Sequence, residues 1–441
     1  MTKTDVLVET GSFRVDPRRM LEKLKLYQLP DAASATMMLV RCGVASGAKL
    51  VDIRILSGLL EARFDGRPFG RSDLRHPFSA LFEPDSAPRR RYAAVAMLRL
   101  LRSQPKWVAL VSGPPSKRYA LLLASIDKQE VSPVSGSSES RTVLRAEWGF
   151  WRNLRSRRFR PEPRGFDKLC ATCPASIRVN GRSWFSPAWR RLRGFPFRGE
   201  SVRGSLELPE NPQGGHSRLK AYLHGVEAGR LHTTLLPLKL NAVVDAPDWP
   251  LNASMTGIVK NERFSSVLAR LEPHIRRFLL AMIREQKGRE NTIGRLLLER
   301  KESRDAGRDS YPVRDEASGW TGGSLLQAMT DSRRTLWLRS ACFALRGLVS
   351  RRKGRGEASL KAALDALWSA PLFWDVRGRP LSLAELERTA RGGMVRYSDV
   401  PWPGYDESSR VVWTVWGRTD ITWLSRLTNA PTRQATPPAN S

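Results

Sequence analysis

The side chains able to do chemistry are few and far apart in this chain of 441 residues. Cys170 and Cys173 form a Cys-x-x-Cys pair, but a zinc site needs four ligands, and the sequence has no second pair and no His-x-x-x-His motif to complete one. We therefore expect this pair to pack in a core rather than to bind metal or act in redox chemistry. Cys42 and Cys342 lie in apolar helical patterns and are expected to be ordinary buried thiols.

The histidines offer no alternative, because none of them has the spacing to a nucleophile that a catalytic motif requires. The sequence thus predicts no catalytic residue, no hydrolase triad and no metal site. The histidines are His76, His216, His224, His232 and His274.

The stretch 34–69 has the most informative pattern. Apolar residues at i, i+3, i+4 and i+7 predict a helix with one buried face, which Gly47 ends. Residues 51–55 and 60–64 alternate between apolar and charged side chains and predict two half-buried strands. A turn should follow at Asp65-Gly66, because glycine takes positive φ without steric cost. The apolar helix positions are Ala35, Met38, Leu39, Cys42 and Ala45.

This order of helix, Gly-Ala, two strands and Asp-Gly turn resembles the N-terminal half of the GHKL ATPase superfamily, which includes gyrase, MutL, histidine kinases and the heat-shock protein 90 chaperones. The resemblance implies a nucleotide pocket whose helix carries a Glu that activates water, an Asn that holds magnesium and a further Asp. Those places fall on Met38, Cys42 and Ala45. The family's D-x-G-x-G turn, whose Asp recognises adenine, falls on Phe64, Asp65, Gly66, Arg67 and Pro68.

Only Gly66 matches the family's motifs, and each departure has a chemical consequence. The thioether of Met38 cannot act as a general base. The thiol of Cys42 is a poor ligand for magnesium, which demands oxygen. Phe64 could stack on a purine but cannot accept a hydrogen bond from its amine. We therefore expect no hydrolysis and no cofactor, with ATP and magnesium as ligands only if the pocket remains functional.

Where the superfamily has a glycine-rich lid, this chain has three arginines, Arg89 to Arg91, before an almost wholly apolar helix. They are interpreted as the solvated start of a buried helix, and the alternative is that they meet an anion. Strands are predicted at 107–112 and 119–124.

The charge balance raises a second possibility, since the net charge is +31 and the pI is near 11. Such a balance favours nucleic acid or another polyanion as partner, although codon usage in a GC-rich genome also enriches arginine. Two stretches interleave arginines with aromatic residues, as polyanion binding requires, or as amphipathic packing surfaces do. The candidate polyanion residues are Arg152, Arg155, Arg157, Arg158, Arg160, Arg190, Arg191 and Arg193.

Beyond residue 140 the pattern changes. Residues 131–140 are predicted to be a small-residue linker or lid-like loop. Strands are expected at 143–148, 176–179 with an Asn180-Gly181 hairpin turn, 206–208, 219–226, 233–238 and 241–245, and helices at 163–173 and 262–286. This second α+β domain resembles the transducer domain of the same superfamily, whose Lys or Arg reaches the γ-phosphate. Lys260 lies in a loop-like segment, but no motif assigns it that role.

The last third is predicted to be helical at 325–349 and 358–368, then mixed. Ser382 and Glu385 form a capping box before a helix at 383–390, and residues 411–416 form a strand. The tail from 429 to 441 is expected to be disordered. No apolar run approaches the roughly 20 residues of a membrane span. The N-terminus lacks the features of a secretory signal, so a bacterial-type cytoplasmic location is expected.

The sequence therefore predicts an α+β protein: a GHKL-type α/β sandwich at 1–140, a transducer-like α+β domain at 141–290, a helical to mixed region at 291–428 and a tail at 429–441. Bacterial heat-shock-protein-90-like proteins are the nearest resemblance. The favoured function is a pseudo-ATPase that acts as a chaperone-like scaffold or protein-interaction module. The alternatives are a divergent ATPase with a chaperone role and a basic polyanion-binding protein. The protein partners and the oligomeric state are not predicted.

Overall fold

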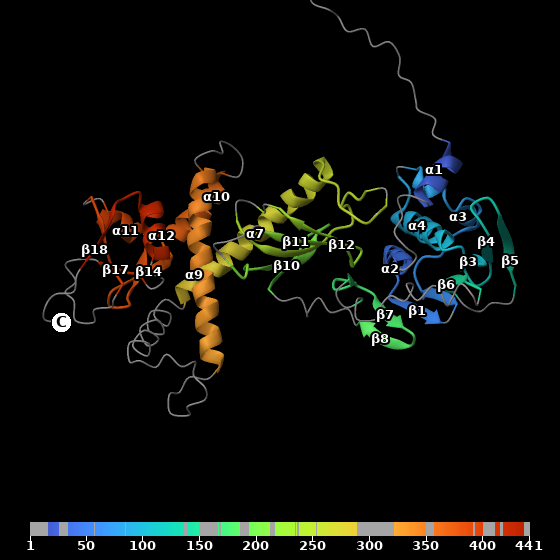
Figure 1. Ribbon diagram of the computed structural model, residues 1–441, viewed down its shortest axis with the longest axis horizontal. Helices are drawn as coiled ribbons and strands as arrows, with labels where there is room; N and C mark the ends of the chain where they lie inside the picture. The colour runs from blue at the N-terminus through green and yellow to red at the C-terminus, as the bar shows by residue number, and fades with distance from the viewer. Residues whose placement is uncertain are drawn as a thin grey trace, which may run out of the picture.

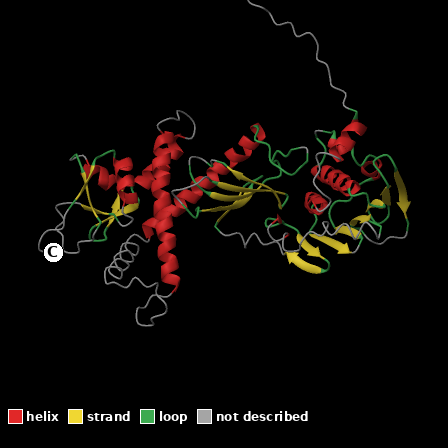
Figure 2. Cartoon of the chain, in the orientation of Figure 1, coloured by secondary structure: helices red, strands yellow, loops and turns green. Residues whose placement is uncertain are grey.

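The computed structural model describes residues 16–25, 34–56, 58–83, 85–135, 140–149, 166, 169–185, 194–211, 217–233, 235, 238–252, 254–288, 322–349, 357–390, 393–399, 411–414 and 418–435. These residues form three sheets that follow one another along the molecule, with the helices α9 (Gly322–Val349) and α10 (Glu357–Trp368) between the second and third (Figure 1). Helices and strands are mixed throughout, so the protein is α+β (Figure 2).

The first sheet has eight strands in the order β5-β4-β3-β6-β2-β1-β7-β8. All neighbours are antiparallel except β1 and β7, which run parallel. The strands are β1 (Leu50–Leu56), β2 (Leu59–Phe64), β3 (Trp107–Ser112), β4 (Arg118–Leu123), β5 (Gln129–Val134), β6 (Thr142–Glu147), β7 (Ser176–Val179) and β8 (Arg182–Phe185).

Helices α2 (Ala35–Ala45) and α4 (Pro88–Arg102) lie side by side over one face of this sheet (Figure 1). Alternate strand residues such as Val51, Ile53 and Ala62 point under them and are fully buried. On the opposite face Arg54 and Arg145 are half exposed, because no described helix covers it. Two short helices, α1 (Pro17–Lys23) and α3 (Arg71–Arg75), and a 3-10 turn at Ser79–Leu81 complete the unit.

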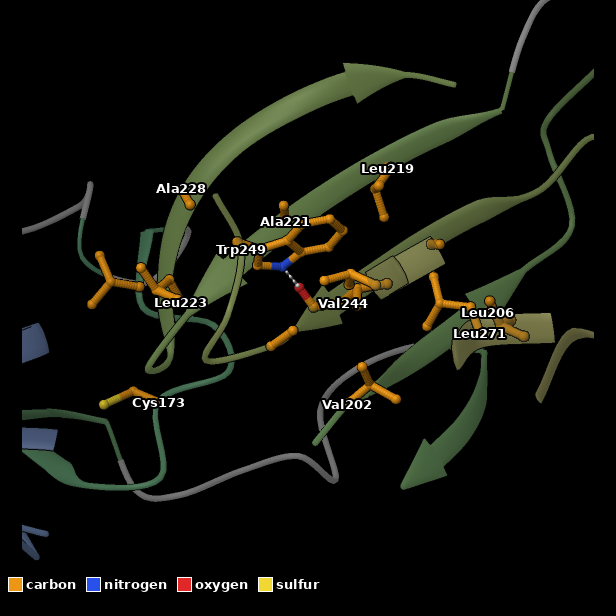
Figure 3. Close-up of a cluster of buried hydrophobic side chains, with 14 of the residues drawn as sticks. Cys173, Val202, Leu206, Leu219, Ala221, Leu223, Ala228, Val244, Trp249 and Leu271 are labelled. Atoms are coloured by element: carbon orange, nitrogen blue, oxygen red, sulfur yellow. Dashed lines mark hydrogen bonds between the residues drawn. The ribbon is translucent and has the colours of Figure 1, made fainter. Parts of the chain in front are cut away.

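The second sheet has the order β12-β11-β13-β10-β9 and packs against the long helix α7 (Glu262–Gly288). Its strands are β9 (Phe195–Arg198), β10 (Arg203–Glu207), β11 (Arg218–Leu223), β12 (Val226–His232) and β13 (Asn241–Asp245). Figure 3 shows their core, where Leu206, Leu219 and Val244 gather with Leu271 of α7. The Trp249 indole lies among them and its Nε1 donates a hydrogen bond of 3.5 Å to the Val244 carbonyl.

The third sheet has the order β15-β14-β17-β16-β18. Its elements are β14 (Pro371–Asp375), β15 (Pro380–Ser382), α11 (Leu383–Ala390), β16 (Val395–Ser398), β17 (Val411–Trp413), α12 (Arg418–Thr428) and β18 (Thr432–Gln434). The predicted capping box is confirmed, since Ser382 N donates to the Glu385 carboxylate at 2.8 Å and Glu385 N donates to Ser382 Oγ at 3.3 Å.

Most predicted elements of the first 125 residues are confirmed, including the helix that ends before Gly47, where φ is +78°. The Asn180-Gly181 turn is confirmed as well, because both residues have positive φ between β7 and β8. The predicted boundary at 140/141 falls between β5 and β6, which belong to one sheet together with β7 and β8 from further along the chain.

Three predictions of local structure were wrong. Residues 129–134 form the edge strand β5 rather than a loop, because they pair with β4 and an edge tolerates Pro133. A hairpin at His224-Gly225 divides the strand predicted at 219–226, and the partner strand β12 covers 226–232 instead of 233–238. Part of the supposedly disordered tail forms β18, which pairs with β16.

Candidate functional site

The helix α2 positions the residues that stand at the predicted pocket. Met38 and Cys42 lie one turn apart on its buried face, and Phe64 at the end of β2 lies beneath the same helix. All three are at most 2% exposed and belong to the hydrophobic core. Gly43 allows this close packing, because a Cβ there would come within 2.8 Å of Val51 and 3.4 Å of Phe64.

The Cys42 thiol points toward the start of α4, where its Sγ lies 3.4 Å from the carbonyl oxygen of Arg89. Burial raises the pKa of this thiol to about 12, although the Arg89 charge and a hydrogen bond with Ser46 act in the opposite direction. The thiol is therefore protonated at neutral pH. A protonated thiol is not a metal ligand, because the thiolate is the ligating form.

The remaining predicted pocket residues lie at the C-terminal end of α2. Ala45 is half-buried, and Asp65 is exposed. One carboxylate oxygen of Asp65 accepts hydrogen bonds from the backbone amides of Lys49 and Leu50, at 2.9 and 3.0 Å. Asp65 therefore fixes the entry into β1.

Gly66 plays a different part from the one that the Asp-Gly motif predicts, since it is not among the glycines with positive φ. A Cβ at this position would lie 2.6 Å from the Ser46 carbonyl oxygen, and the next amide, of Arg67, donates to that same oxygen at 2.7 Å. The glycine is needed for a close approach of two backbone segments.

The lid arginines bind the protein itself. Arg89 donates to the carbonyl oxygens of Arg67 and Pro68 at 2.8 and 2.7 Å, and its guanidinium lies over the Phe69 ring at 4.9 Å. Arg90 forms ion pairs with Asp73 at 3.0 Å and Glu83 at 3.1 Å. Arg91 donates to the Glu83 carbonyl. These contacts tie the start of α4 to the turn after β2, to α3 and to Glu83, so the interpretation as a merely solvated helix start was incomplete.

These residues do not fit magnesium or adenine. The set offers one thioether, one protonated thiol and one aromatic ring, all buried, and the single carboxylate is bonded to backbone amides. Within the described ranges, no group of three or more His, Cys, Asp or Glu side chains is placed to hold a metal ion.

Two buried arginines beside this site were missed, because charged residues inside an apolar helix are ordinarily assigned to its solvent face. Arg41 of α2 is 2% exposed and Arg99 of α4 is 1% exposed. Arg41 donates to the carbonyl oxygens of Glu227 at 2.9 Å and Met255 at 3.1 Å, and Arg99 donates to those of Ser34 and Ser254. The one available signal is that helical spacing places position 41 beside Met38.

The other predicted residues are placed as follows. Cys170 and Cys173 are buried free thiols, and burial raises the pKa of Cys173 to about 11. Lys260 is exposed, just before α7. All eight polyanion candidates lie outside the described residues. The helix predicted at 163–173 is described only at 166 and 169–173, where residues 166 and 169 are helical and 170–172 form a turn.

No helix that the structure describes combines the length and the apolar character needed to cross a bilayer. No protein-family model matches this chain, and no curated protein matches it.

Proposed function

We propose that this chain is a heat-shock-protein-90-like scaffold of GHKL ancestry that no longer hydrolyses ATP and acts as a chaperone-like protein-interaction module. The observation that carries the proposal is the burial of Met38, Cys42 and Phe64, each at most 2% exposed. A nucleotide pocket must be concave and carry a few polar groups that fix the ligand. Here packed apolar side chains take those places.

The ancestry is supported by the order of elements around these residues. A helix followed by two antiparallel strands and a tight turn lies on an eight-stranded sheet, and a second sheet with one long helix follows. This agrees with the resemblance to an ATPase domain and a transducer domain. Function is argued from the site rather than from the fold, because one fold hosts many activities. The site favours a scaffold that needs neither nucleotide nor metal.

Two assays test this proposal together. Phosphate release from Mg-ATP should not exceed that of a buffer control, and suppression of the aggregation of a chemically denatured model client should be the same with and without Mg-ATP. Client protection that requires Mg-ATP would contradict the proposal and favour a divergent ATPase. Lack of any client protection would remove the chaperone-like part.

A second candidate function, polyanion binding, is favoured by the net charge of +31. Neutralisation of phosphates releases counterions, so such binding weakens steeply as salt rises. It does not require the nucleotide pocket, and the same chain could combine it with a scaffold role.

A further inference from the structure

Polar contacts join the helix layer of the first sheet to the second sheet. We call this boundary the seam and define it by contacts of Arg41, Arg99, Tyr92 and Thr172 with the second sheet and the loop at 254–257. The Tyr92 ring meets the His224 ring edge to face at 5.5 Å between centroids. Thr172 Oγ1 donates to the buried Asp245 carboxylate at 3.4 Å. The seam therefore brings together α2, α4 and the segment before β7 on one side, and β12, β13 and the turn between β11 and β12 on the other.

Arg41 is the central residue of the seam. Its two terminal nitrogens donate to carbonyl oxygens that lie 28 residues apart in the chain, on Glu227 of β12 and on Met255 of the loop. Arg41 forms no ion pair with any residue that the structure describes, and its Nε has no hydrogen-bond partner there. A buried cation is costly unless it is paired, so these carbonyl contacts must offset the loss of its hydration.

Arg99 binds the same loop from the neighbouring helix. It donates to Ser254 at 2.5 Å and, through its other terminal nitrogen, to Ser34 at 3.0 Å, just before α2. The backbone of the loop is strained where it contacts the arginines. Met255 has a φ of +53°, a conformation that residues other than glycine rarely adopt. Strained backbone of this kind persists where its surroundings impose it. Asn252 holds the loop from within, because its side-chain oxygen accepts from the Thr256 and Gly257 amides.

We propose that Arg41 and Arg99 form a latch that holds the second sheet against the helices of the first without any nucleotide. This inference rests on the proposed function, because a scaffold without a working pocket needs some other means of coupling its parts. The guanidinium suits the role, since its planar fork can bind two carbonyl oxygens from different segments and keeps its charge when buried. The latch would fix the placement of the second sheet against the first whether or not a nucleotide is bound.

Hydrogen–deuterium exchange on the full chain tests the latch. In the Arg41→Met/Arg99→Met variant, the amides of Met255, Thr256 and Gly257 should exchange about tenfold faster or more, because methionine cannot donate to the loop. Those of the first sheet, such as Ile53 and Ala62, should stay protected. Arg89→Met is the matched control. Arg89 also lies on α4 and donates to two carbonyl oxygens, but these belong to Arg67 and Pro68, within the first sheet and its helices. It should leave the loop unchanged.

Unchanged loop exchange in the double variant would overturn the latch. If that variant does not fold, Arg41→Lys replaces it, because lysine keeps the charge but cannot span two carbonyl oxygens, and the loop should again exchange faster. The wild-type chain supplies an independent arm. Its loop should be equally protected with and without Mg-ATP, and protection that appears only with Mg-ATP would overturn the latch. Binding of Mg-ATP with no effect on the loop would contradict the proposed function while it supports the latch.

Discussion

Met38 and Cys42 show how single side chains decide what the first sheet can do. A carboxylate and an amide would hold charge and metal at these two places on α2, whereas a thioether and a thiol hold only neighbouring apolar atoms. Their burial was predictable, because helical spacing puts both on one apolar face. The burial of Arg41 and Arg99 was not, because three of the four carbonyl oxygens to which they donate, those of Glu227, Ser254 and Met255, lie more than 150 residues away in the chain.

Truncation of Met38 distinguishes a filled core from an open pocket. We expect Met38→Ala to lower the free energy of unfolding by about 2–5 kcal/mol, because it leaves a cavity, and Met38→Leu to cost less than about 1.5 kcal/mol. Urea denaturation measures both. A cost near zero for the alanine variant would mean that Met38 lines open space.

Glu61 gives the first sheet a pH-dependent contribution to stability. Burial acts to raise the pKa of its carboxyl, but hydrogen bonds from Arg63, at 2.7 Å, and from Arg145, together with their charges, outweigh burial and hold the pKa below its usual 4.5. A depressed folded-state pKa means that the contribution is present above the unfolded-state pKa and is lost as pH falls through the folded-state value.

Accordingly, Glu61→Gln should lower the free energy of unfolding by about 1–3 kcal/mol near neutral pH. The difference in free energy of unfolding between this variant and the wild-type chain should become smaller below about pH 4.5. Denaturant titrations across this pH range measure it, with Glu147→Gln as the control, since Glu147 pairs with an exposed Lys106 and should matter little. A difference independent of pH would refute this role of the carboxylate.

At the scale of elements, long helices were easier to predict than strands. The periodic pattern identifies α7 and α9 nearly to their ends. It missed β12, because the hairpin at His224-Gly225 lacks the Asn-Gly or Asp-Gly pair that ordinarily marks such a turn. It also missed β18, because a strand of three residues is too short to show alternation. Pairing of β1 with β7 joins segments more than 100 residues apart and has no local signal at all.

The contact between α9 and α12 is a further case in which a buried charge joins elements. Arg339 and Asp420 form an ion pair and are at most 1% exposed, and Arg339 also donates to the Leu372 carbonyl at 2.7 Å. Its guanidinium lies 3.7 Å from the centroid of the Phe373 ring. Removal of one member of such a pair leaves the other charge buried without compensation.

We therefore expect Asp420→Ala to lower the free energy of unfolding of the C-terminal region by about 3–5 kcal/mol. The matched control is Asp127→Ala, which removes an ion pair with Arg18 in which both side chains are at least 44% exposed, and which should cost less than about 1 kcal/mol. Thermal or chemical denaturation measures both variants. Equal costs for the two would show that burial of the pair is not what makes it matter.

At the scale of the whole molecule, the three sheets lie in a row (Figure 1). Buried arginines join neighbouring elements: Arg41 and Arg99 connect the helices of the first sheet to β12 and the loop at 254–257, and Arg339 connects α9 to α12. The α+β class could be predicted from the sequence. The extent of the first sheet could not be predicted, because β7, with its hairpin partner β8, pairs with β1 more than 100 residues earlier in the chain. The +31 net charge is a property of the whole chain as well and bears on partners rather than on fold.

If polyanion binding is real, retention on heparin should fall steeply between low and moderate salt, because bound counterions are released on binding. Elution from heparin at a series of salt concentrations measures this, and a cation-exchange column of equal charge density is the control. Retention that does not change with salt would count against polyanion binding.

We propose that apolar side chains fill the place where the resemblance implies a nucleotide pocket. Isothermal titration of the full chain with ATP in the presence of magnesium tests it most directly, with Met38→Ala beside the wild-type chain to show whether an opened space changes the result. The account predicts no magnesium-dependent binding to the wild-type chain. Tight, saturable binding that requires magnesium would contradict it.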